Sequence, residues 1–155
     1  MPEEGGPIQG QGPIQGEGPI GVEDSKLDEM LGAARAIMPR AYVPYSGFHV
    51  GAAILNEDGT IRTAVNVENA SYPLSVCAER NAASAMVVSG HAKILAVAVA
   101  TDGPSPTPPC GGCRQVLWEF GGADTPVVVE GANGVRARWR LGELLPHAFG
   151  PDDLR

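Results

Sequence analysis

The stretch PVVVEGANGVRARWR, residues 126–140, decides how the carboxyl-terminal half of the fold is built. Two strand-like runs, PVVVE and VRARWR, are separated by only the four residues GANG. Four residues can close an antiparallel hairpin, whereas a crossover between parallel strands needs about a dozen or more. The sequence therefore predicts that the last two strands are antiparallel.

The patterns around this hairpin predict alternating helices and strands. A helix begins near Ser25, where SKLD places an N-cap with an acid three residues later, and Pro39 ends or kinks it. Asp58-Gly59 is typical of a hairpin turn. The other expected elements are strands at 49–56, 60–67 and 94–101, helices at 77–89 and 111–120, and a last helix at 141–149. This order predicts an α/β fold, a three-layer α-β-α sandwich with a mixed five-stranded sheet.

The chain divides into a short tail and one domain. Residues 6–23 contain three imperfect copies of a six-residue unit, GPIQGQ, GPIQGE and GPIGVE. One isoleucine per unit buries too little apolar surface to offset the entropy of ordering a solenoid. Residues 1–24 are therefore expected to form a flexible Gly/Pro-rich tail, and residues 25–155 the domain.

Composition narrows the possible partners. A formal net charge of −7 argues against binding to nucleic acid, which requires clustered Lys and Arg. No apolar run reaches the length of a membrane span, and the amino terminus lacks the features of a signal peptide. We therefore expect a cytoplasmic protein that binds neither nucleic acid nor membrane.

All three cysteines occur at the starts of predicted helices. Cys77 begins one helix, and Cys110 and Cys113 form a C-x-x-C pair at the start of another. The pair can direct two sulfurs at one ion, and a third thiolate from the other helix supplies three of the four ligands of a zinc tetrahedron. Helix amino termini also favour thiolate over thiol. The spacing predicts a zinc site.

The missing fourth cysteine indicates a catalytic site, because structural zinc sites are closed by four protein ligands. Zinc lowers the pKa of bound water, and Glu79, two residues after Cys77, is placed to take and deliver its proton. Two other interpretations are that the cysteines are small buried hydrophobic residues and that a histidine closes a structural site. His49, His91 and His147 show no ligand-like spacing with a cysteine, and we assign them no function.

These motifs resemble those of the small zinc-dependent cytidine deaminases. CAER at 77–80 and PCGGCRQVLWEF at 109–120 are similar to the family's metal motif, in which a glutamate that is not a ligand moves protons. AYVPYSGFHVGAA, NVENASY and LLPHAFGPDDL resemble further family signatures. The resemblance extends from about Ser25 to Leu154 and leaves only the tail outside.

The resemblance implies a set of site residues. One zinc ion per subunit would be bound by Cys77, Cys110 and Cys113, with Glu79 as the proton shuttle and Arg80 beside the sulfurs. Substrate contacts would come from Phe48 against the pyrimidine, Asn66 and Glu68 on the ribose hydroxyls, and the backbone N–H of Ala78 on the base carbonyl. The family's small members are homotetramers, in which the position of Phe149 reaches into a neighbour's pocket and that of Tyr72 lies near the subunit interface.

Three positions depart from the family pattern, and none removes a metal ligand. Val65 replaces a frequent cysteine, Gly47 a frequent basic residue, and Asn81 a small hydroxyl residue. The implied activity is hydrolytic deamination of cytidine and 2′-deoxycytidine to uridine and 2′-deoxyuridine in pyrimidine salvage. The alternatives are deamination of a modified nucleoside or nucleoside antibiotic, a nucleic-acid editing deaminase and a non-catalytic zinc module.

Overall fold

The computed structural model describes residues 22–155, so the repeat tail lies almost entirely outside the described residues. Its centre is a five-stranded sheet in the order β2-β1-β3-β4-β5. The strands are β1 Val50–Asn56, β2 Ile61–Val65, β3 Ile94–Thr101, β4 Pro126–Glu130 and β5 Arg136–Arg140. Only the β3–β4 pair is parallel; β4 and β5 are antiparallel, with Val128 opposite Arg138. The mixed sheet and the antiparallel final hairpin are confirmed.

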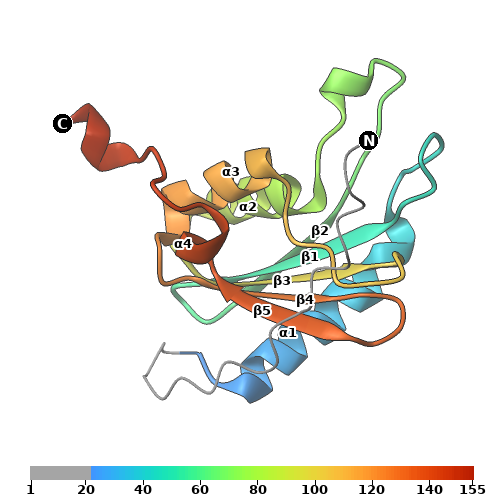
Figure 1. Cartoon of the computed structure of the whole chain (residues 1–155), viewed down its shortest axis with the longest axis horizontal. Coiled ribbons are helices and arrows are strands. Elements are labelled where there is room, and N and C mark those ends of the chain that lie inside the picture. Colours follow the sequence, from blue (N-terminus) through green and yellow to red (C-terminus); the bar gives the residue numbers. More distant parts are fainter. Residues whose placement is uncertain (1–21) are drawn as a thin grey trace, which may run out of the picture.

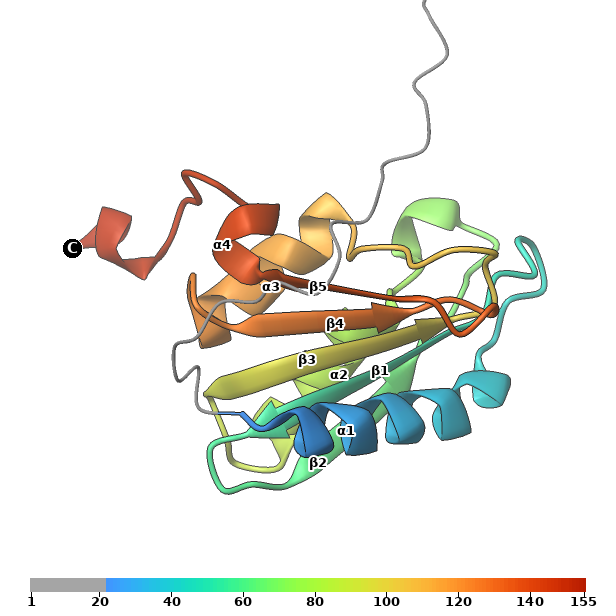
Figure 2. The ribbon, with the colours of Figure 1, turned by 60° about the horizontal axis from the view of Figure 1, so that its bottom comes forward.

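Helices cover both faces of the sheet. The α-helices are α1 Asp24–Ile37, α2 Ala78–Val88, α3 Gly111–Gly121 and α4 Leu141–Leu144. Helix α1 lies along one face, and α2, α3 and α4 lie on the other (Figures 1 and 2). Each face has its own buried apolar cluster, which confirms the three-layer sandwich. Within residues 22–155, no helix is both long and apolar enough to cross a membrane.

Strand β3 is buried on both faces, as its nearly continuous apolar sequence predicts. Val97 and Val99 belong to the cluster beneath α2 and α3, whereas alanines at 96, 98 and 100 pack towards α1. The small residues let α1 approach closely. At Gly51 of the neighbouring strand, an added Cβ would lie only 2.0 Å from the carbonyl oxygen of Ala34 in α1.

The predicted N-cap of the first helix and the predicted end of the last helix are wrong. Helix α1 begins at Asp24 after Glu23, and the Ser25 hydroxyl contacts the Glu23 carboxylate at 3.4 Å instead of capping the helix. The last helix was expected over 141–149 but ends at Leu144. Pro146 disfavours helical backbone at Leu145, which adopts φ −137° and ψ 69°, and His147 has a positive φ of 56°.

Candidate active site

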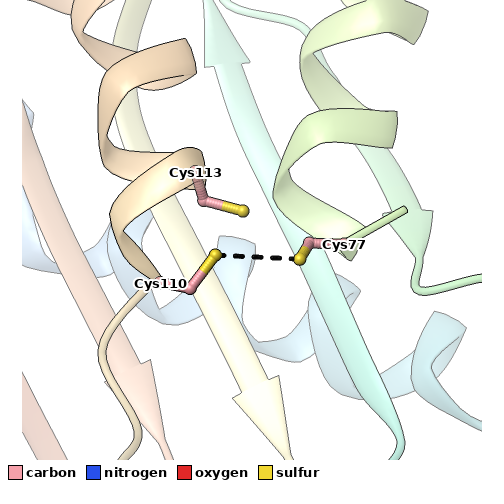
Figure 3. Close-up of side chains that lie close together, drawn as sticks. All are labelled: Cys77, Cys110 and Cys113. Atoms are coloured by element: carbon pink, nitrogen blue, oxygen red, sulfur yellow. Dashed lines mark hydrogen bonds between the residues drawn. The ribbon is translucent and has the colours of Figure 1, made fainter. Parts of the chain in front are cut away.

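Three cysteines from two helix starts converge on one point (Figure 3). Cys77 and Cys110 are the N-cap residues of α2 and α3, and Cys113 lies in the first turn of α3. Their sulfurs lie within 4.8 Å of one another, and the Cys77–Cys110 Sγ–Sγ distance is 3.8 Å. Tetrahedral zinc with Zn–S bonds of about 2.3 Å holds two sulfurs about 3.8 Å apart. The cluster therefore fits a zinc ion.

Interactions among the three cysteines shift the pKa values of Cys77 and Cys113. Hydrogen bonding from the Cys113 thiol lowers the pKa of Cys77 to about 6 against the effect of burial, with help from Cys110 and the Arg80 charge. The same hydrogen bond, together with burial, raises the pKa of Cys113. Arg80 is exposed, and no hydrogen bond joins it to a sulfur within the described part of the chain. Its contribution is therefore long-range charge.

Glu79 lies in the first turn of α2 and is only 5% exposed. Burial raises the pKa of its carboxyl group to about 7, and the neighbouring Cys77 thiolate adds to the effect. The carboxylate makes no ion pair with any residue between 22 and 155. A carboxyl group with a pKa near neutrality can both accept and donate a proton, which is what acid–base catalysis requires.

A pocket of about 180 Å³ opens beside the cysteines and Glu79. Its floor consists of Val50 from β1 and Val99 and Thr101 from β3. The other lining residues are Phe48, Asn66, Cys77, Ala78, Glu79, Thr107, Pro108 and Cys110. A mostly apolar pocket with a few polar groups is typical of a small-molecule site.

Asn66 and Glu68 hold the loop that carries Phe48. The Asn66 amide donates to the Phe48 carbonyl at 2.8 Å, and its oxygen accepts the Val50 N–H at 2.9 Å. Glu68 accepts the Ser46 hydroxyl and the backbone N–H of Tyr45 at 2.9 Å. The Ser46 hydrogen bond lowers the pKa of Glu68. Asn66 also lines the pocket, whereas Glu68 is not among its lining residues.

The two residues assigned to subunit contacts lie on the surface. Tyr72 is 61% exposed and packs edge-to-face on Tyr45, with ring centroids 6.4 Å apart. Phe149 is 58% exposed, and its carbonyl accepts a hydrogen bond from Gln115 at 2.8 Å. Neither residue lines the pocket of its own chain.

Five lining residues were not singled out from the sequence, namely Val50, Val99, Thr101, Thr107 and Pro108. A signal for Thr101 was present. It ends the apolar strand, and period-two alternation puts it on the same face as Val97 and Val99. Thr107 and Pro108 lie in an irregular loop, whose path is not set by any periodic pattern.

Comparisons with known proteins agree on one family. Residues 24–132 match the model described as "Cytidine and deoxycytidylate deaminase zinc-binding region". A cytidine deaminase of Halalkalibacterium halodurans is 44% identical over 83% of this chain and 98% of its own length. That of Mycobacterium tuberculosis is 48% identical over 79% of this chain and 89% of its own length.

Solved structures of cytidine deaminases have the same fold. The enzyme from Burkholderia pseudomallei superposes with a TM-score of 0.76 at 41% identity, covering 79% of this chain and 98% of its own. The enzyme from Mycobacterium tuberculosis superposes with a TM-score of 0.71 at 42% identity, covering 83% and 99%. The region matched by the family model, residues 24–132, contains the three cysteines and Glu79.

Proposed function

The chain belongs to the cytidine and deoxycytidylate deaminase family, and we propose that it hydrolyses cytidine and 2′-deoxycytidine to uridine and 2′-deoxyuridine with release of ammonia. The observation that carries this proposal is a buried carboxyl group, Glu79, beside three convergent cysteine sulfurs in a small pocket. The two relatives named cytidine deaminase match this chain over 98% and 89% of their own length.

Cys77, Cys110 and Cys113 would hold a zinc ion, which would act as a Lewis acid and lower the pKa of water towards neutrality. Glu79 accepts a proton from the attacking water at a carboxylate oxygen. It donates this proton to ring nitrogen N3, then takes the second proton of the same water from the new C4 hydroxyl and donates it to the amine that leaves C4. Water thus supplies the new carbonyl oxygen, and the amine departs as ammonia. The raised pKa of Glu79 suits a group that both takes and returns protons.

The substrate is held by groups around the pocket. Ala78 is the first residue of α2, so its N–H has no acceptor within the helix and can bind the base carbonyl. Phe48 packs against the pyrimidine, and Asn66 and Glu68 hydrogen-bond the ribose hydroxyls. Asn66 and Phe48 line the pocket, and Glu68 holds the same loop in place.

The active enzyme is a homotetramer in which Phe149 reaches into a neighbour's pocket and Tyr72 lies at the interface. This assembly is supported by the apolar surface that a single chain leaves exposed to solvent. Beyond these two exposed aromatic residues, an apolar groove of about 420 Å³ runs between α2 and α3 and includes Val88, which is 88% exposed. We assign the enzyme to the cytoplasm, where its three cysteines, none of which forms a disulfide, stay reduced.

The test is turnover of cytidine and deoxycytidine by zinc-loaded protein, followed as ammonia release and loss of cytidine absorbance. We expect both nucleosides to be deaminated, and activity to disappear with a chelator and return with zinc. Fully zinc-loaded protein that is inert towards both nucleosides would contradict the substrate assignment and favour a modified nucleoside instead.

A further inference from the structure

Thr101, the last residue of β3, is a buried polar residue in the floor of the pocket. It is 3% exposed and shares the face of Val97 and Val99, the face beneath α2 and α3. Its hydroxyl oxygen has no hydrogen-bond partner among residues 22–155. The only polar side chain that the strands contribute to the pocket floor is thus unpaired within the described structure.

The Thr101 hydroxyl and the Phe48 ring both lie close to Gly103. In the β1–β3 register, Thr101 lies opposite Val50, which is another residue of the floor. A Cβ added at Gly103 would lie 3.5 Å from Thr101 Oγ1 and 3.0 Å from Phe48 Cε2. Because residue 103 is glycine, no side chain at this position crowds the Phe48 ring or the Thr101 hydroxyl, and both residues line the pocket.

A buried hydroxyl without a partner is unfavourable, because it loses its hydrogen bonds to water and gains none in return. Valine has nearly the same shape and would remove this cost. One other buried side-chain atom lacks a partner among the described residues, Asn56 Oδ1, but its amide donates to Thr60 at 3.0 Å and it does not line the pocket. Thr101 does line the pocket, so a bound ligand can supply the hydrogen-bond partner that its hydroxyl lacks.

We propose that Thr101 is a substrate-contacting residue whose hydroxyl hydrogen-bonds a polar atom of the bound pyrimidine nucleoside. The inference rests on the proposed function, which supplies the nucleoside. A threonine hydroxyl can donate or accept and can rotate between the two. It therefore suits a pocket that binds the cytosine base before reaction and the uracil base after it, since deamination exchanges an amine for a carbonyl.

The test compares Thr101→Val, which removes the hydroxyl and keeps the shape, with Thr101→Ser, which keeps the hydroxyl. We expect Thr101→Val to raise the KM for cytidine and the Kd for uridine by about 5- to 30-fold, the effect of losing one hydrogen bond. Thr101→Ser should stay within about threefold of the wild type. Ligand-free Thr101→Val should melt at the same temperature as the wild type or higher.

Unchanged KM and unchanged uridine Kd in Thr101→Val would overturn the contact. A lower melting temperature of ligand-free Thr101→Val would also overturn it, because the hydroxyl would then have a partner within the protein. The uridine measurement separates this inference from the proposed function. If the wild type binds uridine but does not deaminate cytidine, the proposed function fails and the Kd ratio still decides the contact. If it binds no uridine, both fail.

Discussion

The residues of the proposed active site are positioned by the ends of helices and strands. Cys77 and Cys110 occupy the N-cap positions of two helices whose starts lie side by side, and Glu79 follows within the first turn of α2. The C-x-x-C spacing and the C-x-E pair were sufficient to predict this cluster. The contacts of Asn66 with Phe48 and Val50 could not be predicted, because they depend on how a loop folds back on a strand.

Cys113 is fully buried, and its sulfur completes the cluster. Cys113→Ser is therefore expected to lower the bound zinc from one ion per chain to a small fraction, because only two cysteine ligands remain. Ser84→Ala, on the exposed side of α2, is the control and should keep its zinc. Metal analysis of the purified proteins measures the effect. Full zinc occupancy in Cys113→Ser would contradict the assignment.

At the scale of elements, the sequence predicted the order of helices and strands, and the four-residue connection predicted the direction of the last pair. The prediction from sequence was wrong for the end of the last helix. The apolar spacing of 141–149 suggested a helix, but Pro146 prevents its continuation beyond Leu144. The close packing of α1 on the sheet was also not predictable, because it depends on which small residues face each other across the layers.

A substitution at Gly51 tests the close packing of α1 on the sheet. Gly51→Ala should destabilise the fold by about 2 kcal/mol or more, because the new Cβ meets rigid helix backbone rather than a movable side chain. Gly32→Ala, within α1 and with nothing within 4 Å of its added Cβ, is the matched control and should be neutral or stabilising. Denaturant unfolding of both proteins decides the question. Equal stabilities would show that α1 can move away without cost.

A chain of ion pairs joins α1 to the final hairpin. Glu130 is 5% exposed, binds Arg35 of α1, and accepts a hydrogen bond from Arg136 Nε at 2.7 Å. Burial raises the pKa of Glu130, but the two arginines outweigh it and hold the pKa below the ordinary value of 4.5. Because the folded pKa is depressed, the stabilisation is complete above the unfolded pKa and is lost as pH falls through the folded one.

Glu130→Gln should therefore lower the unfolding free energy by about 1–2 kcal/mol at pH 7, less than for fully buried pairs because both arginines are half exposed. The difference from the wild type should shrink as pH falls below 4.5, where Glu130 takes up a proton. Glu29→Gln, which breaks an exposed pair with Lys26, is the control and should change little. A difference that is constant with pH would refute this assignment.

At the scale of the whole molecule, one chain leaves much apolar surface uncovered. The last turn, Pro151–Leu154, stands away from the body (Figure 1), and Leu154 is 78% exposed. Phe149 leads into this segment. A tetramer with shared active sites accounts for such a surface, since the exposed side chains of one subunit would be covered by another.

Shared active sites predict complementation between inactive variants. Light scattering should give about four times the 16.0 kDa chain mass. Glu79→Gln would lack the proposed proton shuttle, and Phe149→Ala would lack the side chain that we propose enters a neighbour's pocket. Co-expressed, they should form hybrid tetramers more active than either parent, because some sites combine an intact Glu79 with an intact Phe149. Hybrids no more active than the parents would contradict the sharing of sites.

The central claim is that Glu79 moves protons at a zinc site that deaminates cytidine. The most direct test is to measure zinc content and ammonia release from cytidine for the wild type and Glu79→Gln. We predict that the variant keeps its zinc and loses at least about 100-fold in rate, the usual contribution of a general acid–base. A zinc-loaded Glu79→Gln protein that deaminates cytidine at close to the wild-type rate would contradict the account.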